Sequence, residues 1–187
     1  MSVPVKRTQR TIAAERTRAR LIEAGLALAE VNGLEGVSVN AIVAAAGVSK
    51  GTFFHHFSDR AAYLVGLHRS FHDALGDEIA VATDGMPPGR ARLARAARAY
   101  LDGCLRHRGV KALLLEARGH RPIVDEVLAR NRRSVEAVTA DFAALGRTHP
   151  GHAARLWVAA TAECALIELE SGQADTAARA ALDDVVG

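Results

Sequence analysis

The sequence predicts an all-α fold of about nine helices. Apolar residues recur at helical spacing along almost the whole chain, whereas strand-like alternation is confined to residues 36–39, a stretch too short to define a strand. Four of the five prolines stand at apparent breaks between helices, at Pro87, Pro88, Pro122 and Pro150. Because proline interrupts a helix interior, these positions divide the chain into separate helices.

The first elements surround a basic N-terminal part. A long helix is expected from about residue 8 to residue 31, where Asn32-Gly33 is a typical helix stop. Two short helices are expected within residues 38–57, and a longer one from about residue 59 to the break at 84–89. The remaining helices are expected at residues 89–107, 109–118, 122–145, 151–171 and 173–185.

The size and composition exclude several classes of protein. With 187 residues, the chain can bury a real core in one or at most two domains. Its two cysteines cannot form a disulfide scaffold, and charged residues interrupt every apolar run before it could span a bilayer. The basic start MSVPVKRTQR is not followed by the apolar segment of a signal peptide. We therefore expect a soluble, cytoplasmic protein with no membrane contact.

Positive charge is concentrated at one end. Residues 1–72 hold nine Lys and Arg against five acidic residues, a net charge of +4, whereas residues 73–187 hold fifteen against sixteen, a net charge of −1. This asymmetry favours a polyanionic partner for the N-terminal part. A basic tail that only promotes solubility explains the charge equally well.

Residues 38–57, SVNAIVAAAGVSKGTFFHHF, read as two short helices joined by a tight turn. Ser38 is a good N-cap, and Gly47 ends the first helix. Ser49 is a second N-cap, with Val48 and Phe53 placed to form a hydrophobic staple. Two short helices joined in this way form a helix-turn-helix.

The second of these helices has two different faces. At about 100° per residue, the side expected to face the core holds Ser49, Phe53, His56 and Phe57. The opposite side presents Gly51, Phe54 and His55, flanked by Lys50 and Thr52. A cation, a hydroxyl, an imidazole and an aromatic ring suit the base edges and phosphates of a DNA major groove.

These residues resemble the N-terminal domain of the TetR family of transcriptional regulators. The resemblance extends from about residue 16 to residue 75, a third of the chain, and its most specific part is the string AGVSKGTFFHHF at residues 46–57. The rest of the chain resembles the family only in length and helical character. The resemblance implies a DNA-binding domain with a basic arm over residues 1–58, and a ligand-binding and dimerisation domain over residues 59–187.

The resemblance also implies which residues contact DNA. These are Ser38, Asn40, Ser49, Lys50, Gly51, Thr52, Phe54, His55 and Arg60. Two residues depart from the family pattern: Phe54 stands where tyrosine is usual, which removes a hydroxyl, and Ala41 stands where an acidic residue is common. Affinity is then expected to depend more on Lys50, Arg60 and the basic arm.

A homodimer on a near-palindromic double-stranded operator is expected. An eight-residue recognition helix is only about 12 Å long and touches few base pairs, so specificity requires two copies. The candidate interface is a stripe of Ala153, Trp157, Ala160, Cys164 and Ile167. The alternative is that this stripe packs inside one subunit. The last helix, over residues 174–186, is a second candidate.

The second domain is expected to bind a small, lipophilic effector. The candidate pocket residues are Leu67, Phe71, Leu75, Tyr100, Cys104, Leu114, Arg118, Val127 and Asn131. Most of these residues, taken one by one, are better explained as ordinary core. Arg118 and His120, just before Pro122, are candidates to recognise an anion, although a solvated loop explains them better. The mainly apolar composition of the set favours a lipophilic ligand.

No catalytic or metal site is expected. The sequence has no P-loop, no GxSxG elbow, no HExxH and no GxGxxG, so an enzyme is not predicted. His68 and His72 have the i, i+4 spacing of metal ligands, but no further ligands are singled out, and no metal or cofactor is predicted. Cys104 and Cys164 are expected to be buried free thiols.

Together these features predict a ligand-responsive DNA-binding regulator, a repressor that its effector releases from the operator. The alternative is a helical protein–protein adaptor without specific DNA binding. The basic cluster of Lys50, Arg60 and the N-terminal arm distinguishes the two, because an adaptor has no need of it. DNA binding through such a cluster weakens steeply with salt.

Overall fold

The computed structural model describes residues 9–116 and 121–187. In this part of the chain every regular element is helical, which confirms the all-α prediction. The helices are α1 (Gln9–Gly36), α2 (Val39–Ala46), α3 (Lys50–His56), α4 (Arg60–Thr83), α5 (Arg90–Arg106), α6 (Arg108–Glu116), α7 (Arg121–Ala144), α8 (Pro150–Ser171) and α9 (Thr176–Val185). No helix of the described residues is both long and apolar enough to cross a membrane.

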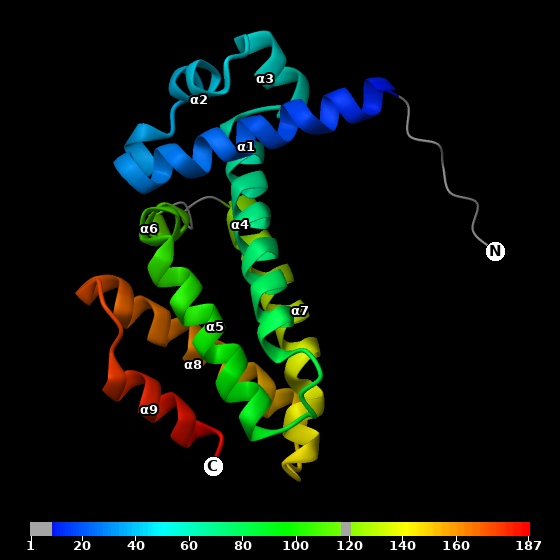
Figure 1. Cartoon of the computed structure of the whole chain (residues 1–187), viewed down its shortest axis with the longest axis vertical. Helices are drawn as coiled ribbons and strands as arrows, with labels where there is room; N and C mark the ends of the chain where they lie inside the picture. Colours follow the sequence, from blue (N-terminus) through cyan, green and yellow to red (C-terminus); the bar gives the residue numbers. More distant parts are fainter. Residues whose placement is uncertain (1–8, 117–120) are drawn as a thin grey trace, which may run out of the picture.

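The helices form a small head on a larger body (Figure 1). In the head, α1 crosses one end of α4, and α2 and α3 lie on the side of α1 away from the body. The body contains α4, α5, α7 and α8, with α9 at its far end. The head contacts the rest of the molecule where α1 packs against α6 and against α4. Of these, α4 is continuous from the head to the far end of the body.

The first helix extends further than the sequence predicted. The expected stop at Asn32-Gly33 is wrong, because α1 continues to Gly36. Helix α6 packs beside this end of α1, where the Gly109 N–H donates to Glu30 Oε2 at 3.0 Å. His107 Nδ1 also lies 3.3 Å from Glu30 Oε1. Tertiary packing of this kind overrides a local stop signal.

A buried aromatic cluster joins α1, α3 and α4. The Tyr63 ring is fully buried, and its centroid lies 5.2 Å from that of Phe53 and 4.9 Å from that of Phe57. Its hydroxyl donates to the Leu21 carbonyl at 2.7 Å, and burial raises the pKa of Tyr63, so that it remains a donor. An added Cβ at Gly25 would lie 1.9 Å from this hydroxyl oxygen, so the close approach requires glycine.

Replacing Tyr63 by phenylalanine should lower the free energy of unfolding by about 1–2 kcal/mol, because the Leu21 carbonyl loses a buried donor. Urea denaturation followed by far-UV circular dichroism measures this change. A denaturation midpoint equal to that of the unchanged protein would contradict an energetic role for the hydrogen bond.

Candidate nucleic-acid interface and ligand pocket

The helix-turn-helix has the capping geometry that the sequence predicted. Ser38 Oγ accepts the Ala41 N–H at 3.2 Å, and Ser49 Oγ accepts the Thr52 N–H at 3.1 Å. Between the helices, Gly47 adopts φ 62° and ψ 42°, the left-handed conformation that favours glycine. The turn is therefore tight, and it fixes the angle at which α3 follows α2.

The faces of α3 divide largely as expected. Phe53 and Phe57 are buried and His56 is half-buried, whereas Lys50, Gly51, Phe54 and His55 are exposed and Thr52 is half-buried. Ser49 was expected on the core side and is instead exposed, because a capping residue lies outside the helical rotation. The Phe54 side chain is 52% exposed, with its ring edge-on to Phe53 at 5.3 Å.

The remaining DNA-contact candidates lie around this helix. Ser38 and Asn40 are exposed at the start of α2. Arg60 is the first residue of α4, directly after its N-cap Asp59, which accepts the Ala62 N–H at 2.8 Å. The Arg60 side chain is half-buried, and its Nε donates to the Val37 carbonyl at 3.2 Å. Arg60 thus connects α4 to the segment before α2.

Two arginines of α1 hold the motif in place, a role that the charge count alone did not reveal. Arg20 donates to the Ala46 carbonyl at the C-terminal end of α2, where carbonyl groups lack helical partners. The Arg18 guanidinium lies 4.8 Å from the centre of the Phe57 ring. Part of the basic excess is therefore used inside the domain.

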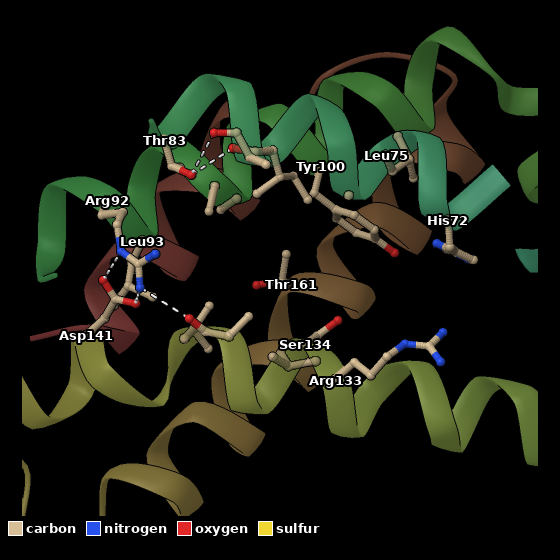
Figure 2. Close-up of a pocket in the computed structure, with 18 of the residues that line it drawn as sticks. His72, Leu75, Thr83, Arg92, Leu93, Tyr100, Arg133, Ser134, Asp141 and Thr161 are labelled. Carbon is tan, nitrogen blue, oxygen red and sulfur yellow. Dashed lines mark hydrogen bonds and ion pairs between the residues drawn. The ribbon is translucent and has the colours of Figure 1, made fainter. Parts of the chain in front are cut away.

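A cavity of about 730 Å³ lies between α4, α5, α7 and α8 (Figure 2). Its apolar wall includes Leu75, Ile79, Leu93, Ala96, Ala97, Val138, Trp157 and Val158. Its polar and charged lining includes His72, Asp73, Asp77, Thr83, Asp84, Arg92, Tyr100, Arg130, Arg133, Ser134, Asp141 and Thr161. The cavity has the size and mixed lining of a small-molecule site.

The structure places two of the predicted pocket residues, Leu75 and Tyr100, in the cavity wall. The others lie elsewhere in the fold: Leu67, Phe71, Cys104 and Leu114 are buried in the core, and Val127 and Asn131 are half-buried on α7. Arg118 and His120 lie outside the described residues.

The polar stripe of α7 was missed. Arg130, Ser134, Ala137 and Asp141 recur every three or four residues and all line the cavity. That spacing was visible in the sequence as a helical face with a charge at each end. Apolar periodicity alone could not single it out, because two of its members are charged.

Two buried carboxylates of the body are paired with arginines. Asp141 is fully buried, and its Oδ1 accepts the Gly89 N–H at 2.8 Å and the Arg92 Nε–H at 2.7 Å. Glu126, also buried, lies 2.7 Å from Arg69 and 3.6 Å from Arg133. The hydrogen bond from Arg69 lowers the pKa of Glu126, so its carboxylate stays ionised.

The histidine and cysteine candidates have the following positions. The rings of His68 and His72 lie 4.5 Å apart, and the described residues contain no group of three or more side chains that could hold a metal. Cys104 and Cys164 are buried free thiols, as predicted, and burial raises the pKa of each.

The candidate interface stripe on α8 lies partly inside the subunit. Trp157 and Cys164 are buried, with the Trp157 ring 6.3 Å from that of Phe142. Ala153 and Ala160 are half-buried, whereas Ile167 is 39% exposed. Leu156, on the outward face of α8, is 69% exposed.

Comparison with known proteins identifies the head of the molecule. Residues 21–65, which contain the helix-turn-helix, match the family model for bacterial regulatory proteins of the tetR family. The chain carries the N-terminal helix-turn-helix domain of the TetR family. No curated protein matches the sequence. The family model describes bacterial regulatory proteins, which are generally not enzymes.

Solved structures share the fold over almost the whole chain. A transcriptional regulator from Rhodococcus sp. Rha1 is 24% identical, with 91% of this chain and 94% of that chain covered and a TM-score of 0.73. A TetR-like transcriptional regulator from Rhodococcus sp. RHA1 is 19% identical, with coverages of 91% and 93% and a TM-score of 0.70. The multidrug binding protein EbrR, solved with imidazole, is 24% identical, with coverages of 91% and 94% and a TM-score of 0.73. The TetR-family fold therefore includes the helical body as well as the head.

Proposed function

We propose that the protein is a homodimeric transcriptional repressor that a small-molecule effector releases from its operator. Residues 1–58 would bind DNA, and residues 59–187 would bind the effector and dimerise. The observation that supports this most strongly is the exposed face of α3, where the half-exposed Phe54 ring lies beside Lys50, Gly51 and His55. EbrR, which shares the fold, is described as a multidrug binding protein.

Helix α4 supports a mechanism for release. It begins at Arg60, beside the helix-turn-helix, and its second half, from His72 to Thr83, lines the cavity. A ligand that favours a different tilt of α4 would shift the population toward a form with misplaced recognition helices. Besides α4, helix α6 also connects the body to the head, through the hydrogen bond from the Gly109 N–H to Glu30.

For the dimer interface, the exposed face of α8 is a better candidate than the buried stripe. Leu156 and Ile167 are large apolar side chains that solvent reaches, and Ala159 and Glu163 are exposed between them. Three helical turns of one face would pack against the same face of a second copy, as a two-fold interface requires. Trp157 and Cys164 would support this helix from inside the subunit.

Replacing Lys50 by alanine should weaken DNA binding and lower the salt slope of log affinity by about one per subunit, because one phosphate contact is lost in each. The measurement is fluorescence anisotropy on DNA from upstream of the protein's own gene, in stepped salt with mixed-sequence competitor. Arg90, exposed at the start of α5 on the body, provides the matched control, and Arg90→Ala should leave the slope unchanged.

Each result has a defined meaning. Competitor-resistant, salt-sensitive binding supports a specific regulator. An unchanged slope for Lys50→Ala rejects this residue as a phosphate contact. No binding at low salt contradicts the DNA-binding proposal and favours the adaptor. Arg60→Ala would affect two properties. It would remove a proposed DNA contact, and it should also lower the stability of the fold, because the hydrogen bond to the Val37 carbonyl is lost.

A further inference from the structure

One end of the cavity is lined by an arginine of α7, Arg130. Arg130, from α7, lies with Nη1 3.0 Å and 3.2 Å from the two ring nitrogens of His72 on α4, and it also donates to Asn131 Oδ1. Among the described residues, no carboxylate forms an ion pair with Arg130. Within hydrogen-bonding distance the guanidinium therefore meets an imidazole ring and an amide oxygen rather than a carboxylate.

A second cation lies behind the same end. The Lys111 side chain is only 2% exposed, and its Nζ lies 3.0 Å from the hydroxyl oxygen of Tyr100, which lines the cavity. No ion pair to Lys111 is found in the described part of the chain. An ammonium group has three donors, and here one acceptor is a neutral hydroxyl.

The buried Cys104 thiol interacts with the same three residues. Burial raises its pKa, Lys111, the hydrogen bond with Tyr100 and Arg130 lower it, and the charge of Glu168 raises it. Figure 2 shows the Tyr100 hydroxyl on the side of the cavity that His72 borders. The Tyr100 hydroxyl oxygen accepts from Lys111 Nζ, and the hydroxyl also forms a hydrogen bond with the Cys104 thiol.

The other charged residues of the lining are paired or exposed to water. Arg92 is paired with the buried Asp141, and Arg133 with Glu126. The acidic lining residues Asp73, Asp77 and Asp84 are exposed to water. Of the three arginines in the lining, Arg130 is thus the one with no carboxylate partner among the described residues. In a partly buried, low-dielectric site, a cation without a counter-charge is costly, and an anion offsets that cost.

We propose that the cavity takes a small organic carboxylate with an apolar body. The carboxylate would bind the Arg130 guanidinium, and Lys111, on the far side of Tyr100, would supply a second positive charge. The apolar body would lie toward Leu93 and Trp157. This inference rests on the proposed effector-binding function. It specifies the chemical class of the effector, which would be an anionic amphiphile rather than any lipophilic molecule.

The single tryptophan of the chain provides the readout. Trp157 lines the cavity, so its fluorescence should change when a ligand enters. The probes are phenylbutyrate, methyl phenylbutyrate and phenylbutylamine, which share one body and differ in charge, together with octanoate and methyl octanoate. Each carboxylate should bind at least about tenfold more tightly than its ester, and the amine should bind most weakly.

Arg130→Met removes the charge and keeps most of the side-chain volume. It should abolish the preference for carboxylate over ester, whereas the affinity for the ester should stay within about twofold. Arg132→Met is the matched control, because Arg132 is an exposed arginine two residues along the same helix and lies outside the cavity lining. The Arg132→Met variant should keep the preference for carboxylate over ester. Arg130→Lys should retain a reduced preference, which provides a second, conservative variant.

Three results would overturn the proposal. These are equal or tighter binding of the ester or amine, a carboxylate preference that survives in Arg130→Met, and no binding of either carboxylate up to about 1 mM. The titrations contain no DNA, so their failure leaves operator binding as an independent result. Conversely, carboxylate selectivity in a protein that binds no DNA would contradict the repressor and leave the ligand class standing.

Discussion

Replacing Asp141 by alanine should lower the free energy of unfolding by about 3–5 kcal/mol. The carboxylate is fully buried and accepts hydrogen bonds from Arg92 and from the Gly89 N–H. Without it, Arg92 keeps its charge in the cavity wall, and the loop before α5 loses its connection to α7. Thermal and urea denaturation followed by circular dichroism measure the loss.

The pair of Arg98 and Asp183 provides the control for this prediction. Its atoms lie 3.8 Å apart, and the two side chains are 63% and 45% exposed. Because water screens such a pair, Asp183→Ala should cost less than about 1 kcal/mol. The double variant Arg92→Met, Asp141→Leu should recover part of the loss, because it leaves no charge without a partner. Similar costs for Asp141→Ala and Asp183→Ala would contradict the importance of burial.

Gly109→Ala should lower the stability of the protein by disturbing the contact between α6 and α1. An added Cβ would lie 2.5 Å from both the Ala29 carbonyl oxygen and Glu30 Cα, which are backbone atoms that cannot rotate away. The helices must separate, and the bond from the Gly109 N–H to Glu30 lengthens. Overpacking of this kind costs about 1–3 kcal/mol, measurable as a lower unfolding midpoint.

Gly151→Ala is a closely matched control. Gly109 and Gly151 are each the second residue of a helix, α6 and α8, but a Cβ at Gly151 meets nothing within 4 Å. There, alanine should be neutral or should stabilise by about 0.4–1 kcal/mol, through the lower entropy of the unfolded chain. If the two variants shifted stability equally, steric contact with α1 would not be the cause.

The helix boundaries could be predicted where the chain itself supplies the stop or the cap. Pro150 begins α8, Asp59 caps α4, and Ser38 and Ser49 cap the two helices of the DNA-binding motif. The end of α1 could not be predicted in this way. Its last turns pack against α6, which lies some eighty residues further along the chain, and the Gly109 N–H donates to Glu30. Local signals give no information on such a contact.

The same distinction applies to the two sites. The α3 face follows from the rotation of one short helix, so its exposed residues could be named in advance. The cavity is enclosed by four helices whose mutual rotation depends on packing, so Leu75 and Tyr100 were predicted while Arg130 was missed. A charged residue on a helix is usually solvated, and only the opposing position of His72 and Tyr100 makes this one part of a pocket.

A small tilt of α4 at one end displaces its other end, because the helix is long. Its 24 residues form a single rod of about 36 Å, with the cavity at one end and the recognition helix near the other. A tilt of about 5° at the cavity end moves the far end by about 3 Å over this length. That displacement is close to the rise of one base pair, about 3.4 Å. In the proposed dimer, a ligand that tilts α4 by about 5° would therefore move each recognition helix out of register with its half-site.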